Sequence, residues 1–331
     1  MGALRPDSGP PERAGRHRRR RENQRHLALP LKMQPELLLD ARASLGEGPA
    51  WHARRKQLLW LDILAGKIHF YTPKNGEGST LEVGMRPGCL VPAPSNDLLL
   101  GVEHGFARLR LPAVADGALP AENLTWLAQP EAHLPHNRFN DGKCAPEGRF
   151  LAGTMDTREQ DASGTLYSLA PDGRLQTLKT GLKISNGLAW SADGRTLYHI
   201  DTPTRQIVAH DYDPVRGQIG APRIVIRVPA ALGWPDGMTS DNRGNLWVGM
   251  WGGAALTVWN PISGKLLKSV ALPAKNVTSC AFGGDSLNEL YITSARQGLS
   301  PVELNAYPLS GGLFRLKTAV EGAPTWEFGR V

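Results

Sequence analysis

The stretch "EGPAWHARRKQLLWLDILAGKIHFYTP" at residues 47–73 has a second copy further along the chain, "NGLAWSADGRTLYHIDTPTRQIVAHDYDP" at residues 186–214. In both copies a polar residue, a glycine and an Ala-Trp pair precede a polar turn, an apolar run ending in aspartate, and a further apolar run. Related segments occupy residues 141–156 and 236–251, and weaker ones occupy 86–105 and 278–296. Self-similarity at a fixed period indicates a repeat architecture.

The period of the repeat predicts a propeller. Its anchor positions, spaced by 40 to 54 residues, are Gly48, Gly88, Gly142, Gly187, Gly237 and Ala281. Apolar runs such as "TLYHID" alternate with turn sequences such as "ADG", which is typical of strands joined by hairpins. Four-stranded propeller blades commonly have about 40–50 residues. We therefore predict an all-β fold, a single six-bladed β-propeller with four-stranded blades. N- and C-terminal strands close the ring, with residues 36–45 beside 311–317 and 324–329.

The positive charge of the chain is concentrated at its N-terminus. Residues 1–32 contain nine Lys/Arg and three Asp/Glu and so carry +6 of the net charge of +7. The remainder is nearly neutral, which argues against a nucleic-acid-binding domain. A run such as "RHRRRRENQR" is typical of a disordered arm, and a polyanion-binding arm is the alternative. The sequence predicts a basic, disordered extension over residues 1–33 and one propeller domain over residues 34–331.

No sequence feature predicts export or membrane insertion. No stretch approaches the roughly 20 apolar residues of a membrane-spanning helix. The three cysteines, Cys89, Cys144 and Cys280, are widely spaced and form no CxxC motif, so neither a disulfide framework nor a zinc knuckle is predicted. We expect a cytoplasmic protein, a monomer or weak homodimer, with no nucleic-acid or membrane partner.

Oxygen-bearing side chains recur immediately before the anchor position. Four copies carry Glu47, Asp141, Asn186 and Asp236 there, and the other two carry Pro87 and Cys280. The first strand of each blade lines the central channel, so we expect these side chains to converge. Buried carboxylates repel one another unless a cation lies among them. The sequence therefore predicts one divalent cation: Ca²⁺, Mg²⁺ or Mn²⁺ suit oxygen ligands, and Zn²⁺ or Fe²⁺ remain possible. The alternative is that Asn-Gly and Asp-Gly form ordinary turns.

The segment "NRFNDGK" at residues 137–143 supplies groups that could hold a substrate. Arg138 and Asn140 would give a donor-rich wall next to the metal for an oxygenated ligand. We predict Arg138, Asn140 and Asp141 as substrate-binding residues. The alternative is that Arg138 only neutralises Asp141.

The segments "LGEGPAWH", "RFNDGKCAPEGRFLAGTM", "SNGLAWSADGRTLYHIDT" and "WPDGMTSDNRGNLWVGMWGG" together resemble the gluconolactonase/regucalcin family, the senescence marker proteins. The resemblance covers roughly residues 36–330. It implies a six-bladed propeller that binds one catalytic divalent metal and hydrolyses sugar lactones. Carried across by motif, it implies Glu47, Asn186 and Asp236 as metal ligands, with Asp236 also as proton acceptor and donor. It further implies that Arg138 and Asn140 hold the sugar hydroxyls.

One position departs from the family pattern. Animal members carry a substrate-contacting glutamate three residues after the methionine of "GTM", where this chain has Arg158, followed by Glu159. The departure leaves open how this loop selects a substrate.

The sequence predicts a metal-dependent hydrolase that opens aldonolactones such as glucono- or arabinonolactone. The cation would polarise the carbonyl, and Asp236 would activate water. No GxSxG motif for a nucleophilic serine is present. The alternatives are a non-enzymatic calcium-binding regulatory propeller and a related propeller esterase or phosphotriesterase. The sequence identifies neither the sugar lactone nor the physiological metal.

Overall fold

The computed structural model describes residues 1–3, 9, 34–112 and 115–329. The chain divides into two units, residues 1–32 and 33–331. The predicted extension over residues 1–33 lies almost entirely outside the described residues, so its disorder stays a prediction. The following description concerns the second unit.

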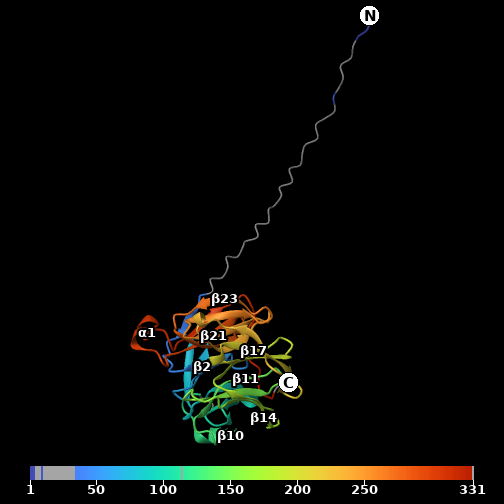
Figure 1. Cartoon of the computed structure of the whole chain (residues 1–331). Coiled ribbons are helices and arrows are strands. Elements are labelled where there is room, and N and C mark those ends of the chain that lie inside the picture. The colour runs from blue at the N-terminus through green and yellow to red at the C-terminus, as the bar shows by residue number, and fades with distance from the viewer. Residues whose placement is uncertain (4–8, 10–33, 113–114, 330–331) are drawn as a thin grey trace. The chain divides into compact units, whose positions relative to one another are not determined.

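The strands of the described residues form six sheets, numbered here as blades in chain order (Figure 1). Blade 1 consists of β2 (Gly46–His52), β3 (Gln57–Asp62), β4 (Lys67–Thr72) and β5 (Glu77–Glu82). Blade 2 consists of β6 (Cys89–Pro92), β7 (Leu98–Gly101), β8 (Phe106–Leu109) and β10 (Leu124–Ala128). Blade 3 consists of β11 (Asn137–Cys144), β12 (Phe150–Asp156), β13 (Gly164–Leu169) and β14 (Leu175–Leu182).

Blades 4 to 6 follow the same plan. Blade 4 consists of β15 (Ser185–Trp190), β16 (Thr196–Asp201), β17 (Gln206–Asp213) and β19 (Arg223–Arg227). Blade 5 consists of β20 (Trp234–Ser240), β21 (Leu246–Trp251), β22 (Ala255–Asn260) and β23 (Lys265–Ala271). Blade 6 consists of β24 (Asn276–Gly283), β25 (Glu289–Ala295), β26 (Leu313–Lys317) and β1 (Glu36–Leu39). Two short strands extend blades 1 and 4, namely β9 (Gly117–Ala118) and β18 (Gln218–Ile219).

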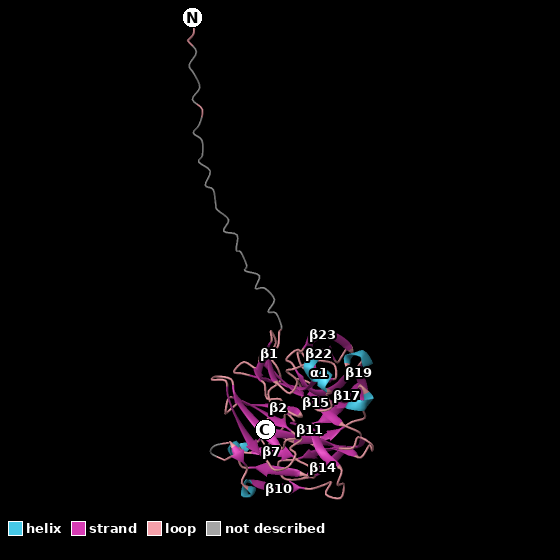
Figure 2. Cartoon of the chain, turned by 90° about the vertical axis from the view of Figure 1, so that its left-hand side faces the viewer, coloured by secondary structure: helices cyan, strands magenta, loops and turns pink. Residues whose placement is uncertain are grey.

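The blades form a closed ring. The first strand of each blade contacts the first strand of the next, and β24 contacts β2. Figure 2 shows β2, β11 and β15 toward the middle of the ring, with β10, β14 and β23 at its rim. The six-bladed all-β prediction is confirmed, and the predicted runs "QLLWLD" and "TLYHID" coincide with β3 and β16.

The ring is closed by one N-terminal strand, as predicted. Strand β1 pairs antiparallel with β26 in the register Glu36↔Arg315 and Leu37↔Phe314, so blade 6 combines both ends of the propeller. The prediction of a strand at 324–329 was wrong. That segment crosses the far end of the propeller instead: the amide of Trp51 donates to Thr325 Oγ1 and the amide of Phe328 donates to the carbonyl of Pro92. Strand β1 occupies the edge of β26, so this segment does not pair there.

The core lies between neighbouring blades. Phe139 on β11 packs edge-on against Phe106 of blade 2, with ring centroids 4.6 Å apart. Trp247 on β21 meets Phe282 of blade 6 in the same way at 5.6 Å. Burial of such rings on both faces of a blade accounts for the apolar runs in the sequence.

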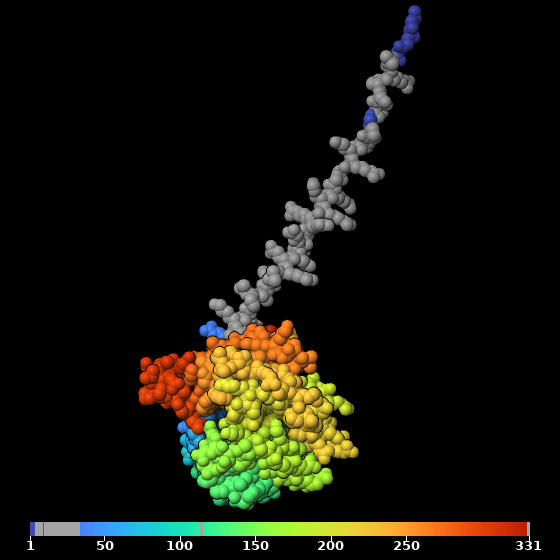
Figure 3. Space-filling model, in the orientation of Figure 1, coloured from blue at the N-terminus to red at the C-terminus, as the bar shows by residue number. Residues whose placement is uncertain are grey.

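Helical structure is confined to connections. Helix α1 (Pro301–Ala306) lies in the β25–β26 loop, where Ser300 and Glu303 form a capping box, and it protrudes from the propeller body (Figures 1 and 3). Short 3₁₀ turns cover η1 (Pro94–Asn96), η2 (Ala121–Asn123), η3 (Thr202–Thr204) and η4 (Ala230–Leu232). Among the described residues, no helix has both the length and the apolar character needed to cross a bilayer.

Candidate functional site

The inner strands begin at a pocket on the propeller axis. This cavity of about 500 Å³ is lined by five residues predicted from the sequence, Glu47, Arg138, Asn140, Asn186 and Asp236. They come from blades 1, 3, 4 and 5, and all five are buried in the chain. The structure thus brings together residues that are up to 189 positions apart in the sequence.

Backbone bulges present these side chains to the pocket. The pairing of β15 with β16 slips by one residue between Asn186 and Leu188, so Gly187 is the extra residue. Similar slips follow Glu47 on β2 and Pro235 on β20. A bulge re-aims a side chain next to it. The anchor glycines also permit close packing between blades, since a Cβ on Gly237 would lie 2.1 Å from Ser279 Oγ.

On blade 3 the bulge of the inner strand falls at a different position from that on blade 4. On β11 the slip falls between Phe139 and Asp141, which makes Asn140 the extra residue there. Asn140 therefore joins the pocket, whereas Asp141 lines a second cavity of about 430 Å³ at the opposite ends of the inner strands. Asp141 Oδ1 accepts from the amide of Gly142 at 2.7 Å, and Oδ2 is buried without a partner. Asp141 thus does not line the pocket that the other five residues share, and its predicted contact with substrate stays a prediction.

The burial of Glu47 and Asp236 is only partly offset by the charge of Arg138. Burial, and next the charge of Asp141, raises the pKa of Glu47 to about 8. Burial, and next the charge of Glu47, raises the pKa of Asp236 well above its usual range. No lysine or arginine of the described residues forms an ion pair with either carboxylate. Two buried carboxylates with this environment fit a bound cation, because a cation would remove the cost of ionising both.

Hydrogen bonds set the orientation of the Asn186 amide. Asn140 Nδ2 donates to Asn186 Oδ1 at 3.1 Å and to the carbonyl of Ser185 at 3.0 Å. Asn186 Nδ2 donates to Thr202 Oγ1 at 2.9 Å, and that hydroxyl donates to the carbonyl of Pro235, next to Asp236. With its nitrogen engaged by Thr202, Asn186 keeps a lone pair of Oδ1 for a cation. Glu47, Asn186 and Asp236 together offer only oxygen ligands, which suits hard divalent cations.

Clusters of three or more His, Cys, Asp or Glu side chains with a metal-site arrangement do not occur among the described residues. The candidate ligand set is of a different composition, since it consists of two carboxylates and one amide.

Arg138 is a buried guanidinium without a carboxylate partner. Its Nη1 donates to Asn140 Oδ1 at 2.8 Å and to the carbonyl of Phe139 at 2.9 Å. Burial, and next the charge of Arg86, lowers the pKa of Arg138 to about 10. Arg86 also lines the pocket and pairs with Glu103 at 2.5 Å. The predicted alternative, that Arg138 only neutralises Asp141, finds no support because no such ion pair forms between these described residues.

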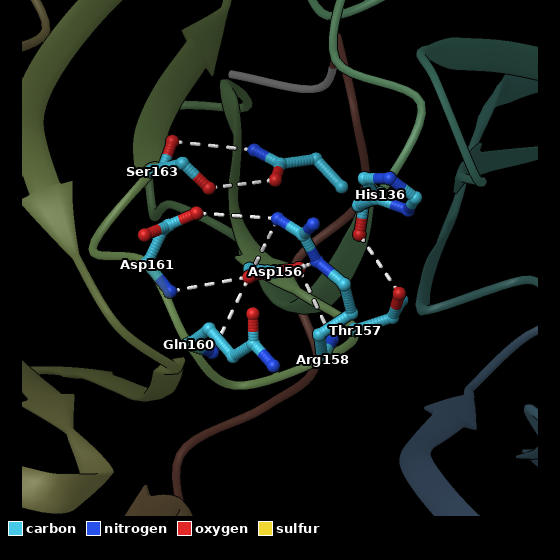
Figure 4. A network of polar contacts seen from close by, with 8 residues as sticks. His136, Asp156, Thr157, Arg158, Gln160, Asp161 and Ser163 are labelled. Carbon is cyan, nitrogen blue, oxygen red and sulfur yellow. Dashed lines mark hydrogen bonds and ion pairs between the residues drawn. The ribbon is translucent and has the colours of Figure 1, made fainter.

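The loop after β12 turns Arg158 away from the pocket. Its guanidinium contacts Asp156 at 3.1 Å and Asp161 at 3.2 Å (Figure 4). Glu159 lines the pocket instead, on a backbone with φ of 56°, a left-handed conformation that is uncommon for residues other than glycine. The acid missing at position 158 is therefore present one residue later.

Sequence reasoning missed several pocket residues. Trp234 and Trp251 are register partners on β20 and β21, and Thr202 begins η3. Trp234 stands two positions before Asp236, so strand alternation could have placed both on one side. Glu159, by contrast, comes from a loop whose path has no sequence signal.

Comparison with known proteins identifies the family of this chain. The family model described as "SMP-30/Gluconolactonase/LRE-like region" matches residues 45–296. The chain belongs to this family. A Bacillus subtilis protein named "Putative sugar lactone lactonase YvrE" is 36% identical over 290 residues, covering 88% of this chain and 97% of the relative. Regucalcin of Gallus gallus is 34% identical, covering 87% and 95%.

Solved structures of the SMP-30/gluconolactonase/LRE-like family superpose on the propeller. A calcium-binding protein, regucalcin, from Agrobacterium tumefaciens matches with a TM-score of 0.83 and 26% identity, covering 90% of this chain and 98% of that one. A luciferin-regenerating enzyme matches with the same TM-score and 28% identity, covering 89% and 99%. A gluconolactonase of Xanthomonas campestris, 23% identical with a TM-score of 0.68, shares the fold.

Proposed function

We propose that this protein is a metal-dependent lactonase that opens sugar-derived lactones to aldonic acids. The observation that carries the proposal is the pocket at the start of the inner strands, where the buried carboxylates of Glu47 and Asp236 form no direct ion pair with any described residue and the buried guanidinium of Arg138 lines the same cavity. Membership of a family with members named as lactonases supports the same reaction. Aldonolactones such as gluconolactone or arabinonolactone are the expected substrates.

Glu47, Asn186 and Asp236 would hold the cation. When bound, a divalent cation supplies Lewis acidity to the lactone carbonyl oxygen. Calcium, magnesium and manganese suit the ligand set best, while zinc and iron(II) also bind carboxylates.

Asp236 would act as the general base. Its carboxylate removes a proton from the attacking water, the water oxygen forms a bond with the acyl carbon, and the bond from that carbon to the ring oxygen breaks. The proton then passes from Asp236 to the departing ring oxygen, which becomes the hydroxyl of the aldonic acid.

Arg138 and Glu159 would orient the sugar. The guanidinium donates to ring or hydroxyl oxygens, and the carboxylate of Glu159 accepts from hydroxyls. Asn140 contributes mainly by holding the amide of Asn186 and the guanidinium of Arg138 in place. Positioning of this kind lowers the barrier without taking part in bond making.

The variant Asp236→Asn separates the two proposed roles of Asp236, metal ligand and general base. Its amide keeps an oxygen for the cation but cannot accept the proton. We expect the variant to lose at least about 100-fold in kcat at saturating metal. Turnover of gluconolactone is followed by acid release and corrected for spontaneous hydrolysis, and metal content is measured on the same sample. Asp172→Asn, in an exposed turn, serves as the control. Undiminished turnover in metal-loaded Asp236→Asn, or in exhaustively chelated protein, would contradict the proposal.

A second candidate is calcium binding without turnover, which the name of the Agrobacterium tumefaciens relative favours. The unpaired Arg138 and the pocket-facing Glu159 favour the enzyme, since a storage site needs neither group. Calcium binding at Glu47 with no lactone opened across a panel of aldonolactones would favour the second candidate.

A further inference from the structure

The pocket has an aromatic wall in addition to its polar base. Trp234, the first residue of β20, lines the pocket with 39% of its surface exposed. Its register partner Trp251 lines the pocket as well, together with Leu64 and Met155. Apolar walls combined with a few polar groups are typical of small-molecule sites.

Arg205 braces the indole from behind. Its Cζ lies 3.4 Å from the centroid of the Trp234 ring, a close cation–π contact. The same guanidinium donates to the carbonyls of Ala230 at 3.3 Å and Gly233 at 2.5 Å, on both sides of the turn that leads into β20. Arg205 thus covers one face of the indole and does not itself line the pocket, which leaves the other face as the one available for stacking.

The turn itself fits this arrangement. Gly233 has φ of 96°, and a Cβ there would lie 2.5 Å from the carbonyl oxygen of Trp251. Only glycine therefore allows the backbone to pass close to β21 and place the two tryptophans side by side on the hairpin. The hydrogen bonds of Arg205 to Ala230 and Gly233 hold the turn, but they do not require an aromatic residue at position 234.

We propose that Trp234, braced by Arg205, is a stacking platform for the C–H face of the substrate's sugar ring. This inference rests on the proposed function, because it assigns the ring of the lactone to the wall beside Asp236. The electron-rich face of an indole attracts the weakly positive C–H groups of a sugar ring, and the ring hydroxyls stay free for Arg138 and Glu159. The substrate class is thus a cyclic polyol lactone with one apolar ring face.

The test uses Trp234→Ala and Trp234→Phe, with Trp126→Ala as matched control. Trp126 lies on β10 with 41% exposure and does not line the pocket. For the alanine variant we expect KM for gluconolactone to rise about five- to tenfold with kcat within about threefold, and for the phenylalanine variant a partial return. Thermal unfolding confirms that each variant is folded. A fall in kcat with unchanged KM would overturn the proposal, since Trp234 would then act only through Asp236.

A second measurement does not depend on turnover. 1,5-Anhydroglucitol has the sugar ring but no carbonyl, so its binding can be followed by saturation-transfer NMR. We expect wild type and Trp126→Ala to bind it equally and Trp234→Ala to bind it at least fivefold more weakly. Equal binding by all three would overturn the platform even if the protein is a lactonase. Loss of binding in Trp234→Ala in a protein without lactonase activity would instead support the platform and reject the proposed function.

Discussion

Single residues at the start of the inner strands decide which end of the channel a side chain serves. Asn140 and Asp141 are neighbours, yet one lines the pocket and the other lines the cavity at the opposite end. The cause is the position of the bulge on β11, which falls two residues earlier relative to the anchor glycine than the bulge on β15. Arg158 and Glu159 are also neighbours of which only one lines the pocket. Glu159, which has a left-handed backbone, lines it, and Arg158 does not.

The different positions of Arg158 and Glu159 lead to a prediction for substitutions at each. Glu159→Ala should raise KM for an aldonolactone about tenfold, because a carboxylate that accepts from a substrate hydroxyl is lost. Arg158→Ala should change KM by less than about threefold, since its guanidinium pairs with the buried Asp156 and the exposed Asp161 and does not line the pocket. Steady-state kinetics on both variants decides the point. A larger effect at Arg158 would show that this loop contacts substrate through the arginine.

At the scale of elements, the closing strand β1 joins the two ends of the propeller. Glu36 pairs with Arg315 at 2.9 Å, and Leu37 packs against the core shared by blades 5 and 6. Without β1 the edge of β26 would be free to pair with another chain.

Two truncations test this assignment. Removal of residues 1–33 should leave the melting temperature unchanged, whereas removal of residues 1–40 should lower it by at least about 5 °C. The expected loss of unfolding free energy is about 2 kcal/mol or more, from the partly buried leucines of β1. Thermal denaturation followed by circular dichroism measures both. Equal melting temperatures for the two proteins would mean that β1 does not hold the ring closed.

At the scale of the whole molecule, buried or partly buried histidines of blades 1 and 4 make folding sensitive to acid. Burial lowers the pKa of His52 and His69 to about 4 and that of His199 to about 3. The unfolded chain takes up these protons below about pH 6.5, so each histidine lowers the free energy of unfolding as the pH falls from 6.5 toward 4. Burial raises the pKa of Glu47 and Asp236, and these carboxyls act in the opposite direction in metal-free protein.

A variant isolates the histidine contribution. His199→Asn should be less stable than wild type at pH 7.5, because the contact of His199 with Ser185 at 3.0 Å is altered. The deficit should shrink toward pH 4.5, by up to about 1.4 kcal/mol per pH unit. Urea denaturation at pH 7.5, 6.0 and 4.5 measures it, with the exposed His133→Asn as control. A deficit that stays constant with pH would refute this account.

The sequence by itself determined the repeat, the number of blades, most strand positions and five residues of the pocket, among them Glu47, Asn186 and Asp236. These features are local: alternation along a strand and turn residues between strands recur in every blade and can be read without knowing what packs against what. Tertiary structure decided the rest. Cross-strand register determines the bulge on β11, which leaves Asp141 outside the pocket. Register and contacts between blades also determine the path of residues 324–329 and place Glu159 and Trp234 at the pocket. Such contacts join distant segments, and their geometry is set by packing, which no single segment contains.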